Sequence, residues 1–228
     1  MALILQIETS TTSCSVALAQ DGLLLAVKEQ TERNIHASHI TVFIEEVLKS
    51  AGYTAKDLDA VAVCMGPGSY TGLRIGVSTA KGLCYALDIP LVALSTLKVM
   101  AAGLVKQFED KDVLLCPMID ARRMEVYTAL FDKALEEIAA VEAKIIDGES
   151  FADILATRKV VFFGDGAEKC REMLGDHPNS IFVNDFNNSA AHATAMAYEK
   201  FKLAQFEDVA YFEPYYLKDF IAGKPKAQ

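Results

Sequence analysis

The chain has 228 residues, of which 52% are hydrophobic and 23% charged, and it carries a formal net charge of −9. This length fits one large domain or two lobes of roughly 100 residues each, and the apolar content excludes a disordered chain. So acidic a chain has no broad basic surface for nucleic-acid phosphates, and its apolar runs fall short of the roughly 20 residues of a membrane span. We therefore expect a cytoplasmic protein with no membrane partner.

Strand and turn signals dominate the beginning of the chain. The apolar N-terminus lacks the basic start of a signal peptide and predicts a first strand. Around the turn Asp21-Gly22, three apolar runs predict an antiparallel meander, at 3–7, 14–19 and 23–27. Alternating strand and helix patterns follow, and their order predicts parallel pairing. These patterns indicate a helix at 40–51, a strand at 58–65, a helix at 73–87, a strand at 90–94 and a helix at 96–108.

The second half opens as the first half does. Strands are expected at 113–119 and 125–131, and an acidic residue, Asp120, follows the first of them as Glu8 follows the first strand of the chain. We interpret this likeness, about half a chain apart, as an internal duplication. The elements expected after it are a helix at 151–156, a strand at 160–163, and helices at 167–174 and 190–204.

The expected domain organisation follows this repeat. An N-terminal lobe covers 1–108, with the first meander, a glycine-rich loop and two helices for a partner, and a C-terminal lobe covers 109–204. The tail, 205–228, is rich in aromatic side chains, which usually pack against another surface. We expect this tail to complete the N-terminal lobe.

The glycine-rich loop, Gly66-Pro-Gly-Ser-Tyr-Thr-Gly72, is the strongest local signal. It joins a buried strand to a helix, so backbone N–H groups at the helix start could face an anion. The loop is neither a Walker loop nor G-x-G-x-x-G, and its spacing equally allows a tight turn with no ligand. Its candidate nucleotide-binding residues are Gly66, Gly68, Ser69 and Gly72.

Carboxylates close the first strand of both meanders. Glu8, followed by Thr9 and Ser10, could hold a hydrated magnesium ion and phosphate oxygens. Taken alone, Glu8 and Asp120 are each better explained as part of an ordinary polar turn, but two such turns related by duplication could face one cleft. As a turn carboxylate Glu8 should contribute little to the core, so Glu8→Ala is expected to leave folding intact.

The spacing of histidine, serine and cysteine gives little support for a metal site or a nucleophilic catalytic site. His36 and His39 could form a metal pair, but no third ligand is close in sequence, so solvated or capping roles are favoured. No G-x-S-x-G is present, and Ser69 and Cys64 lack a base that the sequence identifies. We therefore assign no catalytic residue and no metal site.

Two helices of the first half could serve a partner. The small residues Gly76, Ala80 and Cys84 recur every four positions, which suits either packing within the chain or a helix bundle between subunits. The candidate partner surface consists of His39, Ile40, Phe43, Val47, Arg74, Gly76, Val77, Ala80 and Cys84.

Three segments together resemble one known family. Residues 4–10, Ile-Leu-Gln-Ile-Glu-Thr-Ser, resemble the opening strand of the TsaB/TsaD (Kae/Gcp) branch of the actin-like ATPases. Gly66–Gly76 is similar to the glycine motif of the TsaB (YeaZ) family, and Ile119–Tyr127 to the second motif of that family. The resemblance implies an α/β, two-lobed actin-like ATPase (ribonuclease H-like) fold, with duplicated βββαβαβα lobes of which the second is reduced.

The resemblance also implies a role. Where the catalytic TsaD relatives carry a metal-binding H-x-x-x-H, this chain has Thr96 and Met100, which cannot replace imidazoles as ligands. A non-catalytic but required subunit is implied, one that binds and activates a TsaD-like threonylcarbamoyltransferase in the tRNA threonylcarbamoyladenosine modification complex.

The partners implied are a TsaD-like paralogue in a heterodimer, a TsaE-type ATPase, and tRNA reached through the complex, with a homodimer when the paralogue is absent. ATP or ADP with magnesium could bind at the partner interface. The alternative is an autonomous ATP-binding and hydrolysing enzyme of the same fold that uses Glu8, the glycine-rich loop and Asp120. A peptidase is disfavoured, because no activating base is visible.

Overall fold

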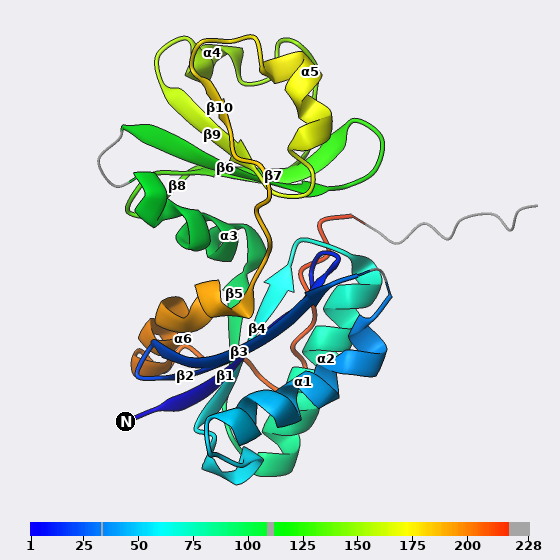
Figure 1. Cartoon of the computed structure of the whole chain (residues 1–228), viewed down its shortest axis with the longest axis vertical. Coiled ribbons are helices and arrows are strands. Elements are labelled where there is room, and N and C mark those ends of the chain that lie inside the picture. The colour runs from blue at the N-terminus through cyan, green and yellow to red at the C-terminus, as the bar shows by residue number, and fades with distance from the viewer. Residues whose placement is uncertain (33, 109–111, 219–228) are drawn as a thin grey trace, which may run out of the picture.

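The computed structural model describes residues 1–32, 34–108 and 112–218, which fold around two five-stranded sheets (Figure 1). The first sheet has the order β3-β2-β1-β4-β5 and the second the order β10-β9-β6-β7-β8. Counted within its own half of the chain, each sheet therefore has the same strand order. In both, the first three strands pair antiparallel and the last two join in parallel. The predicted two-lobed α/β fold class is confirmed.

The strands of each sheet come from one half of the sequence. The first sheet contains β1 (Leu3–Glu8), β2 (Ser13–Gln20), β3 (Leu23–Thr31), β4 (Ala60–Gly66) and β5 (Leu91–Ser95). The second contains β6 (Val113–Asp120), β7 (Glu125–Phe131), β8 (Glu137–Ile145), β9 (Lys159–Phe163) and β10 (Ser180–Phe182). Glu8 and Asp120 are thus the last residues of corresponding strands. The sequence patterns did not predict β8 or β10.

Two long helices, α1 (His36–Ser50) and α2 (Tyr70–Leu87), cover one face of the first sheet. Their apolar stripes pack with alternate residues of β1 and β2 in one buried cluster. Helix α2 begins before the predicted residue 73 because Ser69 caps it. The Ser69 hydroxyl accepts a hydrogen bond from the backbone N–H of Gly72 at 3.3 Å.

Helix α3 (Thr96–Leu104) lies between the two sheets, where Figure 1 shows it below β6 and above β5. Its residues Leu97 and Met100 are buried in the same cluster as Val113 and Leu115 of β6. On its other side, Val99 packs with residues of the first sheet. Helix α3 therefore joins the cores of the two lobes.

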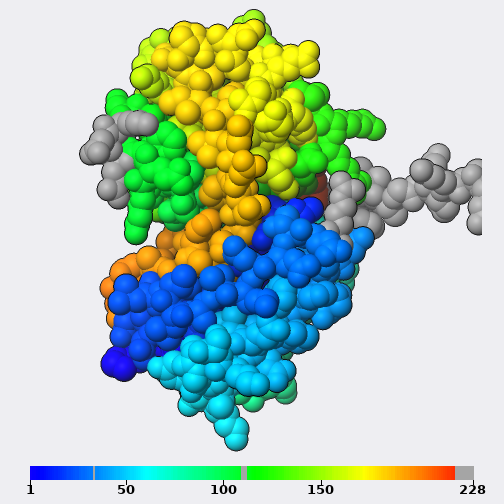
Figure 2. Space-filling view, in the orientation of Figure 1, coloured from blue at the N-terminus to red at the C-terminus, as the bar shows by residue number. Residues whose placement is uncertain are grey.

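The last helix, α6 (Thr194–Lys202), packs on the first sheet rather than on the second. The prediction placed a helix at 190–204 within the C-terminal lobe, but Ala193 and Ala197 are buried against Ile4 of β1. Small side chains at these positions let the helix lie close to the sheet, beside β1 and β5 in Figure 1. The segment that leads to α6 returns the chain to the first lobe, and Figure 2 shows it as a column of yellow-orange atoms across the junction.

The remaining helices are short, and those of the second half are shorter than predicted. This agrees with the expectation of a reduced second lobe. They are α4 (Ala152–Leu155), α5 (Arg171–Leu174) and the 3-10 helices η1 (Ala55–Asp57), η2 (Val105–Phe108), η3 (Glu168–Cys170) and η4 (Ala190–Ala193). None of the helices in the described part of the chain combines the length and the apolarity that a membrane span requires.

The described part of the tail, 205–218, runs back along the first lobe. Glu207 N donates to Leu91 O at 2.9 Å, and Tyr215 N donates to Met65 O at 2.8 Å. Val209 and Phe212 pack against the cluster beneath α1 and α2. These contacts agree with a tail that completes the first lobe. The rest of the predicted tail, 219–228, lies outside the described residues, and the exact lobe boundaries stay a prediction.

Candidate functional site

A cleft of about 830 Å³ lies between the two lobes. The turn after β1 and the glycine-rich loop line one side, and the end of β6 lines the other. The described end of the tail, Tyr216–Lys218, closes part of the mouth. The cleft therefore brings together most of the residues predicted to bind nucleotide, namely Ser10, Gly68, Ser69, Gly72 and Asp120.

Glu8 does not face this cleft. It is the last residue of β1 and is absent from the cleft wall, and its side chain is fully buried, so the prediction that it contributes little to the core is wrong. Its Oε1 accepts hydrogen bonds from Ser10 N at 2.6 Å and from Ser10 Oγ at 2.5 Å. Since removing the carboxylate would leave these buried donors unpaired, Glu8→Ala should cost stability rather than leave folding intact.

The buried Glu8 makes stability depend on pH. Burial raises the pKa of this carboxyl, and the hydrogen bonds from Cys64 and Ser10 only oppose the shift. The folded state then binds this proton more tightly than the unfolded state, so the contribution is present at low pH and is lost as pH rises through the folded pKa. Glu8→Gln keeps an acceptor for Ser10 but cannot ionise.

We expect the stability of Glu8→Gln relative to the native chain to increase between about pH 4 and about pH 8, by more than the ~0.5 kcal/mol typical of surface changes. Urea unfolding at several pH values measures this difference. Glu137→Gln, the same change at an exposed position of β8, should show no such trend. Parallel curves for Glu8→Gln and the native chain would contradict a buried, proton-binding Glu8.

The glycines of the loop allow α2 to lie directly on the turn after β1. A Cβ at Gly72 would lie 2.1 Å from Thr9 O, and a Cβ at Gly68 would lie 2.4 Å from Ser10 O. Thr9 Oγ1 also donates to Gly72 O at 2.8 Å. The glycines at positions 68 and 72 are therefore required by close packing against this turn.

Three backbone N–H groups of the loop and of the turn after β1 are used within the chain. Ser10 N donates to the Glu8 carboxylate, Ser69 N donates to Ser10 O at 2.7 Å, and Gly72 N donates to Ser69 Oγ. Glu8 lies outside the cleft lining, so the cleft holds only part of the set predicted for ATP and magnesium. A nucleotide cofactor stays an untested prediction for this chain.

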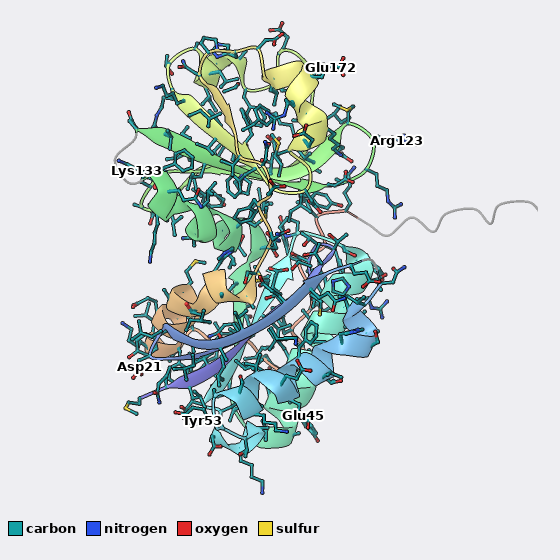
Figure 3. All side chains as sticks on the ribbon, viewed as in Figure 1. Asp21, Glu45, Tyr53, Arg123, Lys133 and Glu172 are labelled. Atoms are coloured by element: carbon teal, nitrogen blue, oxygen red, sulfur yellow. The ribbon has the colours of Figure 1, made fainter. Side chains whose placement is uncertain are left out.

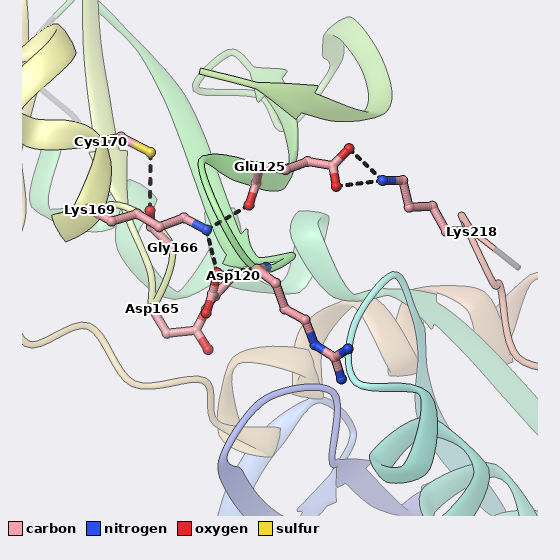
Figure 4. Close-up of polar contacts among 8 residues, drawn as sticks. Asp120, Glu125, Asp165, Gly166, Lys169, Cys170 and Lys218 are labelled. Carbon is pink, nitrogen blue, oxygen red and sulfur yellow. Dashed lines mark hydrogen bonds and ion pairs between the residues drawn. The ribbon is translucent and has the colours of Figure 1, made fainter. Parts of the chain in front are cut away.

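Asp120 is held by a network at the other wall of the cleft (Figure 4). Its carboxylate forms an ion pair with Lys169, which also donates to Glu125 O at 2.7 Å. Asp120 Oδ1 accepts from Arg122 N at 2.9 Å, and Asp120 N donates to Asp165 Oδ1 at 3.0 Å. These contacts hold Asp120 at the base of the β6–β7 turn, where it lines the cleft.

Most of the predicted partner surface faces inward. Seven of its members are buried in the core between the first sheet and its helices. The apolar stripe of an amphipathic helix packs against the sheet of its own lobe. They cannot meet a partner in the folded chain, which corrects that prediction. These residues are Ile40, Phe43, Val47, Gly76, Val77, Ala80 and Cys84. Only His39 and Arg74 reach the surface.

An apolar groove of about 650 Å³ opens on the outer side of the same two helices. Ile44 and Leu48 of α1, Leu83 of α2 and Tyr53 supply apolar lining, and the charged residues Glu45 and Lys49 line it as well. Thr41 and Thr79 stand at its edges. This groove is a better candidate for a partner surface than the buried stripe.

Sequence reasoning missed several residues of the interlobe cleft. Tyr70 and Tyr216 stack with ring centroids 4.9 Å apart, and Lys218 pairs with Glu125 at 2.5 Å. Tyr127 of β7 lines the same cleft. The aromatic tail was noticed, but its place beside the cleft depends on how the chain returns to the first lobe.

The two positions at which the resemblance implies histidines in the catalytic relatives are used for packing in this chain. Thr96 and Met100 are fully buried, and Thr96 Oγ1 accepts a hydrogen bond from Gly66 N at 3.1 Å. Met100 contacts the chain near Gly164, where an added Cβ would lie 2.7 Å from its methyl group. In the described chain no three His, Cys, Asp or Glu side chains are grouped so as to hold a metal ion.

Comparisons with known proteins point to one family. A model of the family described as "TsaD: tRNA N6-adenosine threonylcarbamoyltransferase" matches residues 27–218. The chain is 39% identical over 130 residues to the tRNA threonylcarbamoyladenosine biosynthesis protein TsaB of Escherichia coli, covering 57% of this chain and 55% of that protein. It therefore spans about half the length of this curated relative.

Two further comparisons cover more of the molecule. The TsaB protein of Bacillus subtilis is 32% identical over 178 residues, which cover 76% of this chain and 75% of that protein. The structure of YeaZ from Pseudomonas aeruginosa superposes with a TM-score of 0.83 at 24% identity, covering 95% of this chain and all of that chain. The first of these likenesses supports the family and the second supports the fold.

Proposed function

The chain belongs to the TsaB (YeaZ) family, and from that premise we propose that it is a required, non-catalytic subunit in the biosynthesis of threonylcarbamoyladenosine in tRNA. In this proposal it binds and activates a TsaD-like threonylcarbamoyltransferase, and a TsaE-type ATPase and tRNA join through the complex. The proposal draws on the TsaB and TsaD names of the relatives.

One observation carries the non-catalytic part of the proposal. Thr96 and Met100 stand where the catalytic relatives place histidines, and both side chains are committed to packing. A metal here would have to be held by the buried Thr96 hydroxyl, which already accepts from Gly66 N, and by the Met100 thioether, a soft ligand that does not replace an imidazole.

The outer groove of α1 and α2 is the surface proposed for the paralogue. Much of its lining is apolar, and its edges are the small, exposed or half-exposed residues Thr41 and Thr79. Helices of a partner fit such a groove by laying their own apolar stripe into it. A second copy of this chain could place its own outer groove face against this one, so the proposed homodimer and heterodimer would compete for one surface.

Reconstituted tRNA threonylcarbamoylation tests this function. The assay contains the TsaD-like partner, a TsaC-type synthase, a TsaE-type ATPase and unmodified tRNA, with or without this chain. We expect modification only when the partner and this chain are both present. Modification by this chain without the partner would instead support the autonomous ATP-dependent enzyme, and full activity of the partner alone would refute a required subunit.

A further inference from the structure

The turn between β6 and β7 holds two arginines in the left-handed region of backbone space. Arg122 has a φ of 71° and Arg123 a φ of 51°. Glycine and asparagine adopt this region readily, whereas a long side chain with a Cβ does so at a cost in free energy. Strain of this kind gathers at functional sites, where a side chain is needed for something other than stability.

The base of this turn is held rigidly. Arg122 N donates to the Asp120 carboxylate, whose own backbone N–H donates to Asp165. Lys169 ties Asp120 to the backbone of Glu125 across the hairpin (Figure 4). Because these contacts restrain the backbone of the turn, they also restrain the positions from which the two arginine side chains extend.

Neither guanidinium group is neutralised within the part of the chain that the structure describes. Both arginines are exposed and neither takes part in an ion pair. The other described arginines all have partners, Arg74 with the hydroxyl of Tyr70, Arg158 with Asp112 and Arg171 with Glu168. In a chain with a net charge of −9, this turn is a local cationic surface that lacks an internal partner.

The carboxylates that flank the turn do not cancel its charge. Asp120 is paired with Lys169, and Glu125 is paired with Lys218. Arg122 lines the mouth of the interlobe cleft, whereas Arg123 extends away from the ribbon in Figure 3. The two side chains thus cover the mouth of the cleft and the outer face beside it.

We propose that Arg122 and Arg123 contact the phosphate backbone of the tRNA, an inference that rests on the function proposed above. Guanidinium groups pair with phosphate through two parallel hydrogen bonds, and such contacts fix the register of a nucleic acid without reading its sequence. The acidic remainder of the chain repels RNA, so a single cationic turn would also orient the tRNA on the complex.

The test compares charge-matched pairs of substitutions in the reconstituted complex. Arg122→Gln/Arg123→Gln should raise KM for an unmodified tRNA transcript about tenfold, with kcat little changed, and should reduce the salt dependence of tRNA binding by about two counterions. Arg158→Gln/Lys159→Gln removes the same charge at the start of β9, the opposite end of the second sheet, and should leave KM unchanged.

A second pair separates RNA contact from a structural role. Arg122→Asn/Arg123→Gly suits the left-handed backbone, so it should raise the Tm of the chain while it raises KM for tRNA as the glutamine pair does. Unchanged KM in both arginine pairs, in a complex that the native chain activates, would overturn the inference and leave the proposed function standing. If the native chain fails to activate the partner, the proposed function itself fails, and the inference falls with it.

Discussion

Gly72→Ala should destabilise the folded chain by about 3 kcal/mol or more, a large part of the stability of an ordinary domain. The new methyl group would lie 2.1 Å from Thr9 O, which is backbone, so no side chain can turn aside to admit it. Helix α2 would have to move off the turn after β1. That movement would break the hydrogen bond from Thr9 Oγ1 to Gly72 O and open the core beneath.

The same helix supplies a matched control. Gly82 is exposed, and a Cβ added there meets nothing within 4 Å. Gly82→Ala should therefore stabilise the chain, by up to about 1 kcal/mol, because alanine favours a helix interior. Urea unfolding of both variants measures the difference. Shifts of the midpoint in the same direction would show that α2 does not pack on the turn as described.

If the proposed TsaD-like partner binds the outer groove, Leu83→Glu should weaken that association by about 30-fold or more, which is the effect of removing an interface hot spot. The carboxylate would have to lose its water inside an apolar groove when the partner binds. Leu83 is partly buried against its own core, so Thr41→Arg is a second variant at an exposed edge of the groove. Thr41→Arg should block the partner by bulk and charge while the chain stays folded.

Tyr85→Glu controls for an added charge on α2. Tyr85 is 85% exposed and is not part of the groove, so this change should leave the partner affinity intact. Calorimetric titration of the purified partner measures the three dissociation constants, and circular dichroism confirms folding. If Thr41→Arg and Leu83→Glu bind as tightly as Tyr85→Glu, the partner uses another face.

Much of the architecture could be predicted because strong local patterns coincide with elements. The meander, α1 and the strand before the glycine-rich loop all appear near their expected places. Strand β8 was missed because it is rich in Glu, Ala and Lys, which are uncommon in strands. Its hydrogen-bonded pairing with β7 stabilises the strand despite this low intrinsic propensity. Strand β10, at three residues, is too short to give a pattern.

The candidate site was harder to predict, since it depends on directions that a sequence does not show. Glu8 ends a strand, and whether its side chain points into the core or into a cleft depends on what covers that face. Small residues such as Gly76 and Ala80 suit close approach, but the neighbour proved to be the sheet of the same lobe and not another subunit. The Arg122-Arg123 turn showed its backbone conformation only in three dimensions.

The return of α6 to the first sheet affects the order in which the lobes are completed during synthesis. Every strand of the second sheet comes from one continuous stretch, β6 to β10, so that sheet can close as soon as the stretch has left the ribosome. The first sheet cannot cover its second face until Ala193 and Ala197 arrive, and Phe212 joins its core later still. The lobe that is translated first is therefore completed last. Its second apolar face stays exposed to solvent while nearly half of the chain is still being synthesised.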